Sequence, residues 1–241
     1  MTTKNKLQAI MLVGTLACST ASMAVPVELM SNGDFSSGLA GWTVTNSGSG
    51  NWFADTVGTT TPVSGHTTSA LGGGAGTYAV SDQGGPGTHA LTQAFTAIGG
   101  STIVSFDMFA NDSDGGPIIN PAGLTHTAGP NQHVRVDILA AGAGAFSTLA
   151  TDIVTTLIAP MVDPQANNPN PFSNYLFDIS SFVSTGTTYQ LRFAEVDTNL
   201  FLNMGVDNVS VSSQAVPEPS IVWLLGSGLA LVGLVRRKAR T

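Results

Sequence analysis

The chain is 241 residues long and only 10% of them are charged, against about a quarter in an average globular protein. Between Val25 and Ala215 there are 14 acidic residues but only two basic ones, Arg135 and Arg192, so this segment has a formal charge of −12 and repels nucleic acid and anionic lipid. The single cysteine is Cys18, which excludes disulfides, thiolate metal sites and cysteine nucleophiles from the segment that follows.

The N-terminus has the pattern of a secretory signal peptide. A lysine-containing start is followed by a mainly apolar region of 11 residues, 7–17, and by small residues around Ala24. This order predicts a leader that signal peptidase cleaves between Ala24 and Val25. The apolar run is too short to span a bilayer. Lipidation at Cys18 is an alternative, but the leucine before it is misplaced by one position relative to a lipobox. We therefore expect residues 1–24 to be removed.

The middle of the chain shows the pattern of short strands separated by Gly, Pro, Asn and Asp. In one of them Val134, Val136 and Ile138 alternate with Arg135 and Asp137, which predicts apolar side chains on the inner face and charged ones on the outer face. The predicted strands are 27–30, 42–44, 77–80, 91–97, 102–108, 133–138, 175–178, 189–193 and 206–211. Many short strands with turns between them favour an antiparallel sandwich.

Two motifs at the ends of this segment narrow the expected fold. Residues 32–38 read Asn-Gly-Asp-Phe-Ser-Ser-Gly and are followed by Gly41 and Trp42; this resembles the opening of jelly-roll, galactose-binding-like domains. Residues 205–211 resemble their closing strand. We therefore expect residues 25–213 to form an all-β, antiparallel jelly-roll-like β-sandwich. Many carbohydrate-binding modules share this fold, but a fold does not fix a function.

One acidic residue of the closing strand is a candidate metal ligand. In a regular strand Asp207 shares a face with Val209, and a carboxylate that faces the core needs a partner or a metal. The resemblance implies a structural calcium ion held by Asp207 and the first loop, with Asp34 or the carbonyl of Gly33 as further ligands. The usual glutamate of that loop is replaced by Ser36. An Asp207 that only accepts backbone hydrogen bonds is the alternative.

The sequence contains few residues that would support binding or catalysis. Trp52, Tyr78 and Tyr175 are candidate sugar platforms, since an aromatic face can pack on a pyranose ring. Glu195 and Asp197 could pose as a glycosidase pair, although carboxylates so close in sequence rarely flank a glycosidic bond. No histidine pair has metal-ligand spacing and no Gly-x-Ser-x-Gly elbow occurs. We expect a protein that is not an enzyme; a carbohydrate-binding module and a polysaccharide-active hydrolase or lyase are the alternatives.

The C-terminus combines a proline motif, an apolar run and a basic cluster. Pro217, Glu218 and Pro219 precede 15 uncharged residues, 221–235, which as a helix would span about 22 Å of a hydrocarbon core of about 30 Å. The basic cluster directly after the run is a positive-inside signal, which predicts a single transmembrane helix. The expected anchor residues are Ile221, Trp223, Leu224, Leu229, Leu231 and Val235, followed by Arg236, Arg237, Lys238 and Arg240.

This order of features in residues 214–241 resembles the PEP-CTERM sorting signal. The resemblance implies a Gram-negative, exopolysaccharide-producing bacterium and recognition by an exosortase, with cleavage near Pro217–Pro219. It implies an inner-membrane precursor with a periplasmic ectodomain, and then a product at the cell surface or outside the cell. We therefore expect a secreted or surface protein associated with exopolysaccharide or a biofilm matrix.

Overall fold

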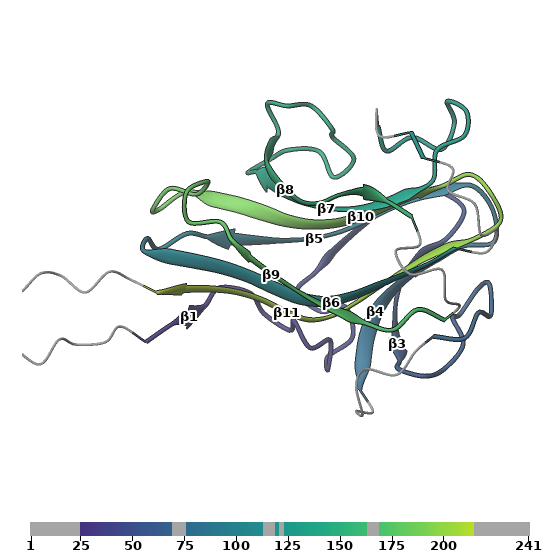
Figure 1. The fold of residues 1–241 in the computed structure, drawn as a ribbon, viewed down its shortest axis with the longest axis horizontal. Helices are drawn as coiled ribbons and strands as arrows, with labels where there is room; N and C mark the ends of the chain where they lie inside the picture. Colours follow the sequence, from purple (N-terminus) through teal and green to yellow (C-terminus); the bar gives the residue numbers. More distant parts are fainter. Residues whose placement is uncertain (1–24, 69–75, 113–118, 121–122, 163–168, 215–241) are drawn as a thin grey trace, which may run out of the picture. The chain divides into compact units, whose positions relative to one another are not determined.

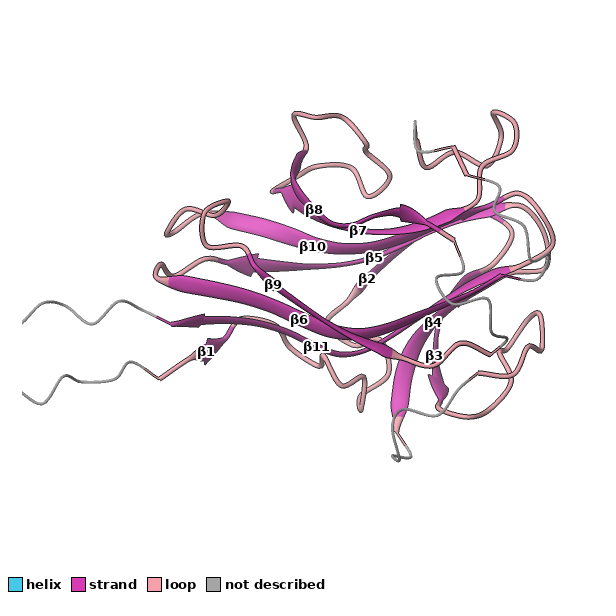
Figure 2. Cartoon of the chain, viewed as in Figure 1, coloured by secondary structure: helices cyan, strands magenta, loops and turns pink. Residues whose placement is uncertain are grey.

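The computed structural model describes residues 25–68, 76–112, 119–120, 123–162 and 169–214. They belong to one compact unit, Val25–Val216, and their regular structure consists of strands (Figure 2). This part of the chain therefore holds no helix that could cross a membrane. The predicted signal peptide and the predicted C-terminal anchor both lie outside the described residues.

The described residues form eleven strands. They are β1 (Val27–Glu28), β2 (Thr43–Gly48), β3 (Asn51–Thr56), β4 (Thr77–Asp82), β5 (Gly87–Thr96), β6 (Ser101–Asp112), β7 (His133–Ala140), β8 (Ile153–Met161), β9 (Ser173–Asp178), β10 (Thr188–Asp197) and β11 (Leu202–Gln214).

The strands form two sheets that pack face to face (Figure 1). The first sheet has the order β3-β4-β11-β6-β9, with β1 also paired to β11, and the second has the order β2-β5-β10-β7-β8. Every pairing between these strands is antiparallel. The last strand, β11, lies between β4 and β6 and so joins the two halves of the first sheet. This arrangement confirms the predicted all-β, jelly-roll-like sandwich.

The core lies between the two sheets and contains the predicted inner faces. Val134, Val136 and Ile138 are completely buried there. The ring of Phe106 from the first sheet meets Phe193 from the second edge-on, with 5.1 Å between ring centroids. Burying one such side chain contributes about 1.5–3 kcal/mol, so these contacts between the sheets are a major source of stability.

Two strands were not predicted, and both lie at a sheet edge. Strand β8 contains Pro160, and its pairing with β7 shifts register at three places, so its apolar residues do not alternate regularly. Strand β3 has one buried side chain, Trp52, between partly exposed neighbours. An edge strand pairs with a neighbour on one side only and packs against fewer side chains, so its hydrophobic pattern is weaker.

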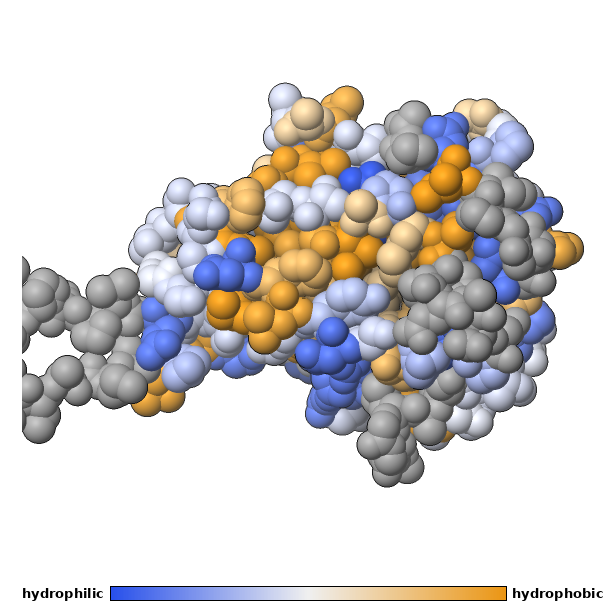
Figure 3. Space-filling model, in the orientation of Figure 1, coloured by the Kyte–Doolittle hydropathy of each residue, from blue (hydrophilic) through white to orange (hydrophobic). Residues whose placement is uncertain are grey.

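The sandwich has two different ends. At one of them, which we call the terminal end, β1 begins, β11 ends, and the loops 97–100 and 179–187 connect strands (Figure 1). The opposite end carries the turns after β2, β4 and β10. On the side between the ends, apolar surface is visible where β8 and β9 form the free edges (Figure 3).

Candidate functional site

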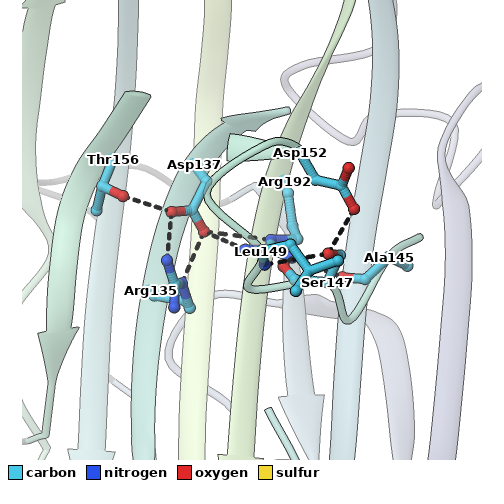
Figure 4. Close-up of polar contacts among 8 residues, drawn as sticks. All are labelled: Arg135, Asp137, Ala145, Ser147, Leu149, Asp152, Thr156 and Arg192. Carbon is cyan, nitrogen blue, oxygen red and sulfur yellow. Dashed lines mark hydrogen bonds and ion pairs between the residues drawn. The ribbon is translucent and has the colours of Figure 1, made fainter. Parts of the chain in front are cut away.

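The only two basic residues of the segment between Val25 and Ala215 bind the same carboxylate (Figure 4). Arg135 donates to Asp137 from Nε at 2.8 Å and from Nη2 at 2.7 Å. Arg192 donates to Oδ2 of Asp137 from Nη2 at 2.5 Å. The hydroxyl of Thr156 donates to Oδ1 at 2.8 Å. Asp137 thus accepts hydrogen bonds from three neighbouring strands, β7, β10 and β8.

Strand register explains why these charges meet. Arg192 on β10 lies directly opposite Asp137 on β7, and Arg135 lies two residues from Asp137, on the same face. The sequence placed Arg135 and Asp137 on the outer face, and that is confirmed. The outer face is nevertheless dry: Asp137 and Arg192 are 0% exposed.

The loop between β7 and β8 covers this network. Arg192 donates from Nη1 to the carbonyls of Ala145, at 2.9 Å, and Ser147, at 2.6 Å. The loop is also closed by its own hydrogen bond, from the Ser147 hydroxyl to Asp152 at 2.6 Å. Arg192 therefore fastens a loop to the sheet while it neutralises a carboxylate.

The buried carboxylate stays ionised because of its partners. Burial by itself raises the pKa of Asp137, but hydrogen bonds from Arg135 and Arg192, together with their charges, outweigh burial and hold the pKa below its usual value. Burial also lowers the pKa of Arg192, which the charge of Asp137 opposes. A cluster with this geometry is structural, because the carboxylate and both guanidinium groups find hydrogen-bond partners inside the protein.

A second buried polar group lies between the sheets, at the end opposite to the terminal end. We call that end of the sandwich the polar end. The buried polar group there comprises Ser81, Gln83, His89, Glu195 and Asp197, all 0% exposed. The Ser81 hydroxyl donates to Oε2 of Glu195. Gln83 donates to Asp197 at 2.9 Å and also to the carbonyl of Leu202. These bonds join the two sheets where apolar packing ends.

Two ionisable groups of the polar end, Glu195 and His89, are held neutral. Burial raises the pKa of Glu195 well above its usual value, and the charges of Asp197 and Asp82 raise it further, whereas the bond from Ser81 opposes this shift. Oε1 of Glu195 has no hydrogen-bond partner among the described residues. Burial likewise lowers the pKa of His89 to about 4. The protonated acid and the neutral imidazole both avoid an uncompensated buried charge.

Burial excludes the glycosidase pair that the sequence left as an alternative. Glu195 and Asp197 do share a strand face, as expected, but that face points between the sheets and a polysaccharide cannot reach carboxyl groups with no exposure. Arg192 lies on the opposite face of β10 from Glu195 and binds Asp137. The fold therefore uses these acid and base groups internally.

Asp207 does not share a face with Val209, which corrects the premise of the calcium prediction. The pairing of β11 with β6 shifts register between Asp207 and Ser210, and Asn208 has a left-handed backbone with φ 51°. Val206 and Val209 both enter the core, so Asp207 points to the outer side of the sheet. It is 4% exposed, and Oδ1 accepts the Asn208 N–H at 2.7 Å.

The other two predicted calcium ligands lie in the loop beside β11. Burial raises the pKa of Asp207 to about 6, and the charges of Asp107 and Asp34 add to this, so Asp34 acts on Asp207 electrostatically. The Gly33 carbonyl accepts the Val209 N–H at 2.9 Å. A Cβ atom at Gly33 would lie 1.8 Å from the Val209 carbonyl oxygen, so close packing requires glycine here. Within the described ranges, no three His, Cys, Asp or Glu side chains are grouped so as to hold a metal ion.

The predicted sugar platforms are mostly in the interior. Trp52 is 2% exposed and Tyr78 is 0% exposed, so neither can stack on a sugar. Tyr175 is half-buried on the edge strand β9. Trp42, from the opening motif, packs in the core and stacks on Phe35 with 5.4 Å between ring centroids.

The most elaborate polar arrangement, around Asp137, was not predicted from the sequence. One signal could have indicated it: the two arginines are the only cations of an acidic segment, and both occur inside predicted strands. A basic residue kept in a strand of such a domain is more easily explained by a buried partner than by solubility.

Residues 215–239 match the PEP-CTERM protein-sorting motif. This confirms the resemblance noted in the sequence and indicates an exported, membrane-anchored precursor that is sorted to the cell surface by an exosortase. Among curated protein sequences, none matches the chain.

Solved structures resemble the sandwich only distantly. The K3 cleaved adhesin domain of Lys-gingipain from Porphyromonas gingivalis W83 has a TM-score of 0.47 and 16% identity, over 78% of this chain and 99% of that one. TmCBM61, solved with β-1,4-galactotriose, has a TM-score of 0.44 and 11% identity, over 77% and 97%. The family 11 carbohydrate-binding module from Clostridium thermocellum has a TM-score of 0.40 and 13% identity, over 78% and 96%. No ligand or activity follows from likeness at this level.

Proposed function

We propose that this chain is a non-catalytic surface or matrix protein, exported by a cleaved signal peptide and held in the inner membrane until an exosortase cuts it near Pro217–Pro219. The sorting motif at residues 215–239 carries this proposal. The sandwich is then the cargo that is displayed on the cell or released into an exopolysaccharide matrix.

Charge gives the anchor its orientation. Arg236, Arg237, Lys238 and Arg240 follow the apolar run, and several cations are costly to move across a bilayer. They therefore stay in the cytoplasm, and the sandwich lies on the periplasmic side. Prolines 217 and 219 disfavour helix, so we expect the motif to be extended and open to a membrane-embedded enzyme.

The polar chemistry of the sandwich supports a non-catalytic role. Within the described residues, Asp137, Arg192, Glu195 and His89 are all buried and engaged in bonds that join strands, loops or sheets. A catalytic acid or base must instead reach the substrate.

Two variants separate anchoring from recognition. Changing both Leu229 and Leu231 to Asp should abolish membrane retention, since each acidic residue at the middle of a helix costs about 3 kcal/mol. Changing Pro217 and Glu218 to Ala should preserve insertion but stop sorting, so that uncleaved precursor accumulates in the membrane fraction. Fractionation with an antibody to the sandwich measures both. Normal processing of the Pro217/Glu218 variant, in a host with the sorting enzyme, would contradict the proposal.

Carbohydrate binding is the second candidate function. Tyr175 and Phe177 lie two residues apart on the edge strand β9, both half-buried, with their rings 6.4 Å apart and only 5° from parallel. Both rings also stack on the buried Phe106. Their partly exposed sides at the sheet edge are therefore the surface on which consecutive sugar rings could pack.

A glycan array tests this candidate. Binding without turnover that is lost in Tyr175→Ala, while Phe182→Ala in the next loop still binds, would support a carbohydrate-binding module. Release of shortened product would instead support the hydrolase or lyase alternative. Absence of both leaves the structural role proposed above.

A further inference from the structure

The terminal end of the sandwich is built from two loops that meet beside the end of β11. The amide of Gly186 donates to the carbonyl of Ala97 at 2.7 Å, which joins the β9–β10 loop to the β5–β6 loop. The Ser213 hydroxyl donates to the carbonyl of Gly99 at 2.9 Å, which joins the latter loop to β11. Both loops therefore surround the point at which the described chain leaves toward the sorting motif.

These two loops are free of charge and expose apolar side chains. Neither 97–100 nor 179–187 contains a charged residue, although the segment between Val25 and Ala215 carries −12. Ile98 is 40% exposed and Phe182 is 50% exposed. Val27, on β1 next to Ser213, is 48% exposed.

The carboxylates that flank the terminal end are tied to neighbouring groups. Asp178 accepts hydrogen bonds from the amide and hydroxyl of Ser180. Glu28 accepts from the hydroxyl of Ser210 and the amide of Val211. Both carboxylates are exposed and lie beside the loops, whereas the loops themselves carry no charged side chain.

The fold holds these apolar tips in place. The amide of Ser184 donates to the hydroxyl of Tyr189 at 2.8 Å, and Ile179 is buried at the base of the loop. Gly99 has φ 90°, and a Cβ atom there would lie 2.6 Å from Oγ1 of Thr185, so the two loops pack closely. A prepositioned apolar tip loses little conformational freedom when it is buried against a partner.

Chain length places this end near lipid. Only six residues lie between Gln214 and Ile221, the first residue of the apolar run. A fully extended chain covers at most about 3.6 Å per residue step, or roughly 25 Å over the seven steps here. The acidic body of the sandwich is repelled by anionic head groups, whereas an aromatic and two aliphatic side chains at a neutral surface are suited to the interface.

We propose that the terminal end rests on the periplasmic leaflet of the inner membrane, with Phe182 and Ile98 at the lipid interface. This inference rests on the proposed membrane-anchored precursor. Contact with the bilayer restricts the orientation of the sandwich and keeps Pro217–Pro219 at the membrane surface, where the sorting enzyme acts.

The test uses the full chain in vesicles of phosphatidylethanolamine and phosphatidylglycerol. In a Cys18→Ser background, Phe182→Cys and Leu200→Cys each carry one polarity-sensitive dye. Leu200 is a matched control, because it is 68% exposed but lies in the loop at the polar end. With brominated lipids, the dye at position 182 should shift to the blue and lose most of its fluorescence, and the dye at position 200 should do neither.

Two outcomes would overturn the inference, and they are distinguishable. If the chain floats with the vesicles but the dye at position 182 behaves like the dye at position 200, the anchor exists and the contact does not. If the chain does not float at all, the membrane-anchored precursor itself is wrong. As a second readout, Phe182→Ser with Ile98→Ser should slow cleavage in a host that has the sorting enzyme, whereas Leu200→Ser should not.

Discussion

Strand β10 carries buried charge-bearing groups on both of its faces. On the outer face, Arg192 binds Asp137, and the pKa of that carboxyl lies below its usual value. On the inner face, Glu195 receives one hydrogen bond from Ser81 and has no cationic partner among the residues that the structure describes, and its pKa lies well above the usual value. Burial is complete in both cases. The partner therefore decides whether a buried carboxyl keeps its charge or takes a proton.

The two solutions have different consequences for the molecule. Removing Asp137 leaves two buried guanidinium groups without a counter-charge, whereas Glu195 in its neutral form leaves no charge uncompensated. The first region should thus be sensitive to mutation, and the second to pH. The predictions below test this contrast.

Replacing Asp137 with Asn should have the largest effect. The change keeps the shape of the side chain but leaves Arg135 and Arg192 buried without a counter-charge, and breaking a buried pair in this way costs about 3–5 kcal/mol. Urea unfolding of the unit Val25–Val216 would measure the loss. Asp178→Asn, at an exposed carboxylate, is the control and should leave the midpoint near that of the wild type. Equal midpoints for both variants would contradict the assignment of Asp137 as the buried counter-charge of the two arginines.

Replacing the two arginines should produce unequal effects. Arg192→Ala removes bonds to Asp137 and to two loop carbonyls, whereas Arg135→Ala removes bonds to Asp137 alone among its described contacts. With about 1.5–3 kcal/mol for a hydrogen bond to a charged group, Arg192→Ala should be the more destabilising variant. It should also speed hydrogen exchange in the β7–β8 loop. Equal exchange in that loop in the two variants would show that Arg192 does not fasten it.

The difference between the two faces shows what the sequence could and could not predict. Period-two alternation gave the correct face for every residue of β7 that was assigned, because alternation is a local property of a strand. The Asp137 network depends on the pairing of residues 55 positions apart in sequence, and no local pattern encodes that register. The orientation of Asp207 was wrong because one left-handed residue, Asn208, inverts the alternation of β11.

Asp207 is a third buried carboxyl group. A cation from solution could neutralise it, as the arginines neutralise Asp137 and a proton neutralises Glu195. Asp207 is buried, and Asp107 and Asp34 add negative charge around it. If calcium binds to Asp207, Asp34 and the Gly33 carbonyl, the melting temperature of Val25–Val216 should rise, since a ligand at one hundred times its Kd stabilises a fold by about 2.7 kcal/mol. Asp207→Asn should reduce the rise, and Asp152→Asn should not. Superimposable melting curves with calcium and with a chelator would exclude the site.

The smallest effect is expected at Glu195, and it should depend on pH. Its pKa is raised on folding, so protonation stabilises the fold fully below the unfolded value of about 4.5, and this contribution is lost as pH rises toward the folded value. The histidines act in the opposite direction: the pKa values of His89 and His133 fall to about 4 on folding, so their contribution is present above 6.5 and is lost as pH falls. The wild-type profile is therefore a sum of opposing trends.

Glu195→Gln isolates one of these trends. Glutamine has nearly the same shape, can still accept the bond from Ser81 and carries no charge at any pH, so the variant should match the wild type near pH 4 and become the more stable protein as pH rises above it. A pKa difference of one is worth about 1.4 kcal/mol, which urea unfolding at a series of pH values can resolve, and Asp178→Asn should show no such trend. If the difference between Glu195→Gln and the wild type were the same at every pH, Glu195 would not change its protonation on folding, and the contrast between the two faces of β10 would fail.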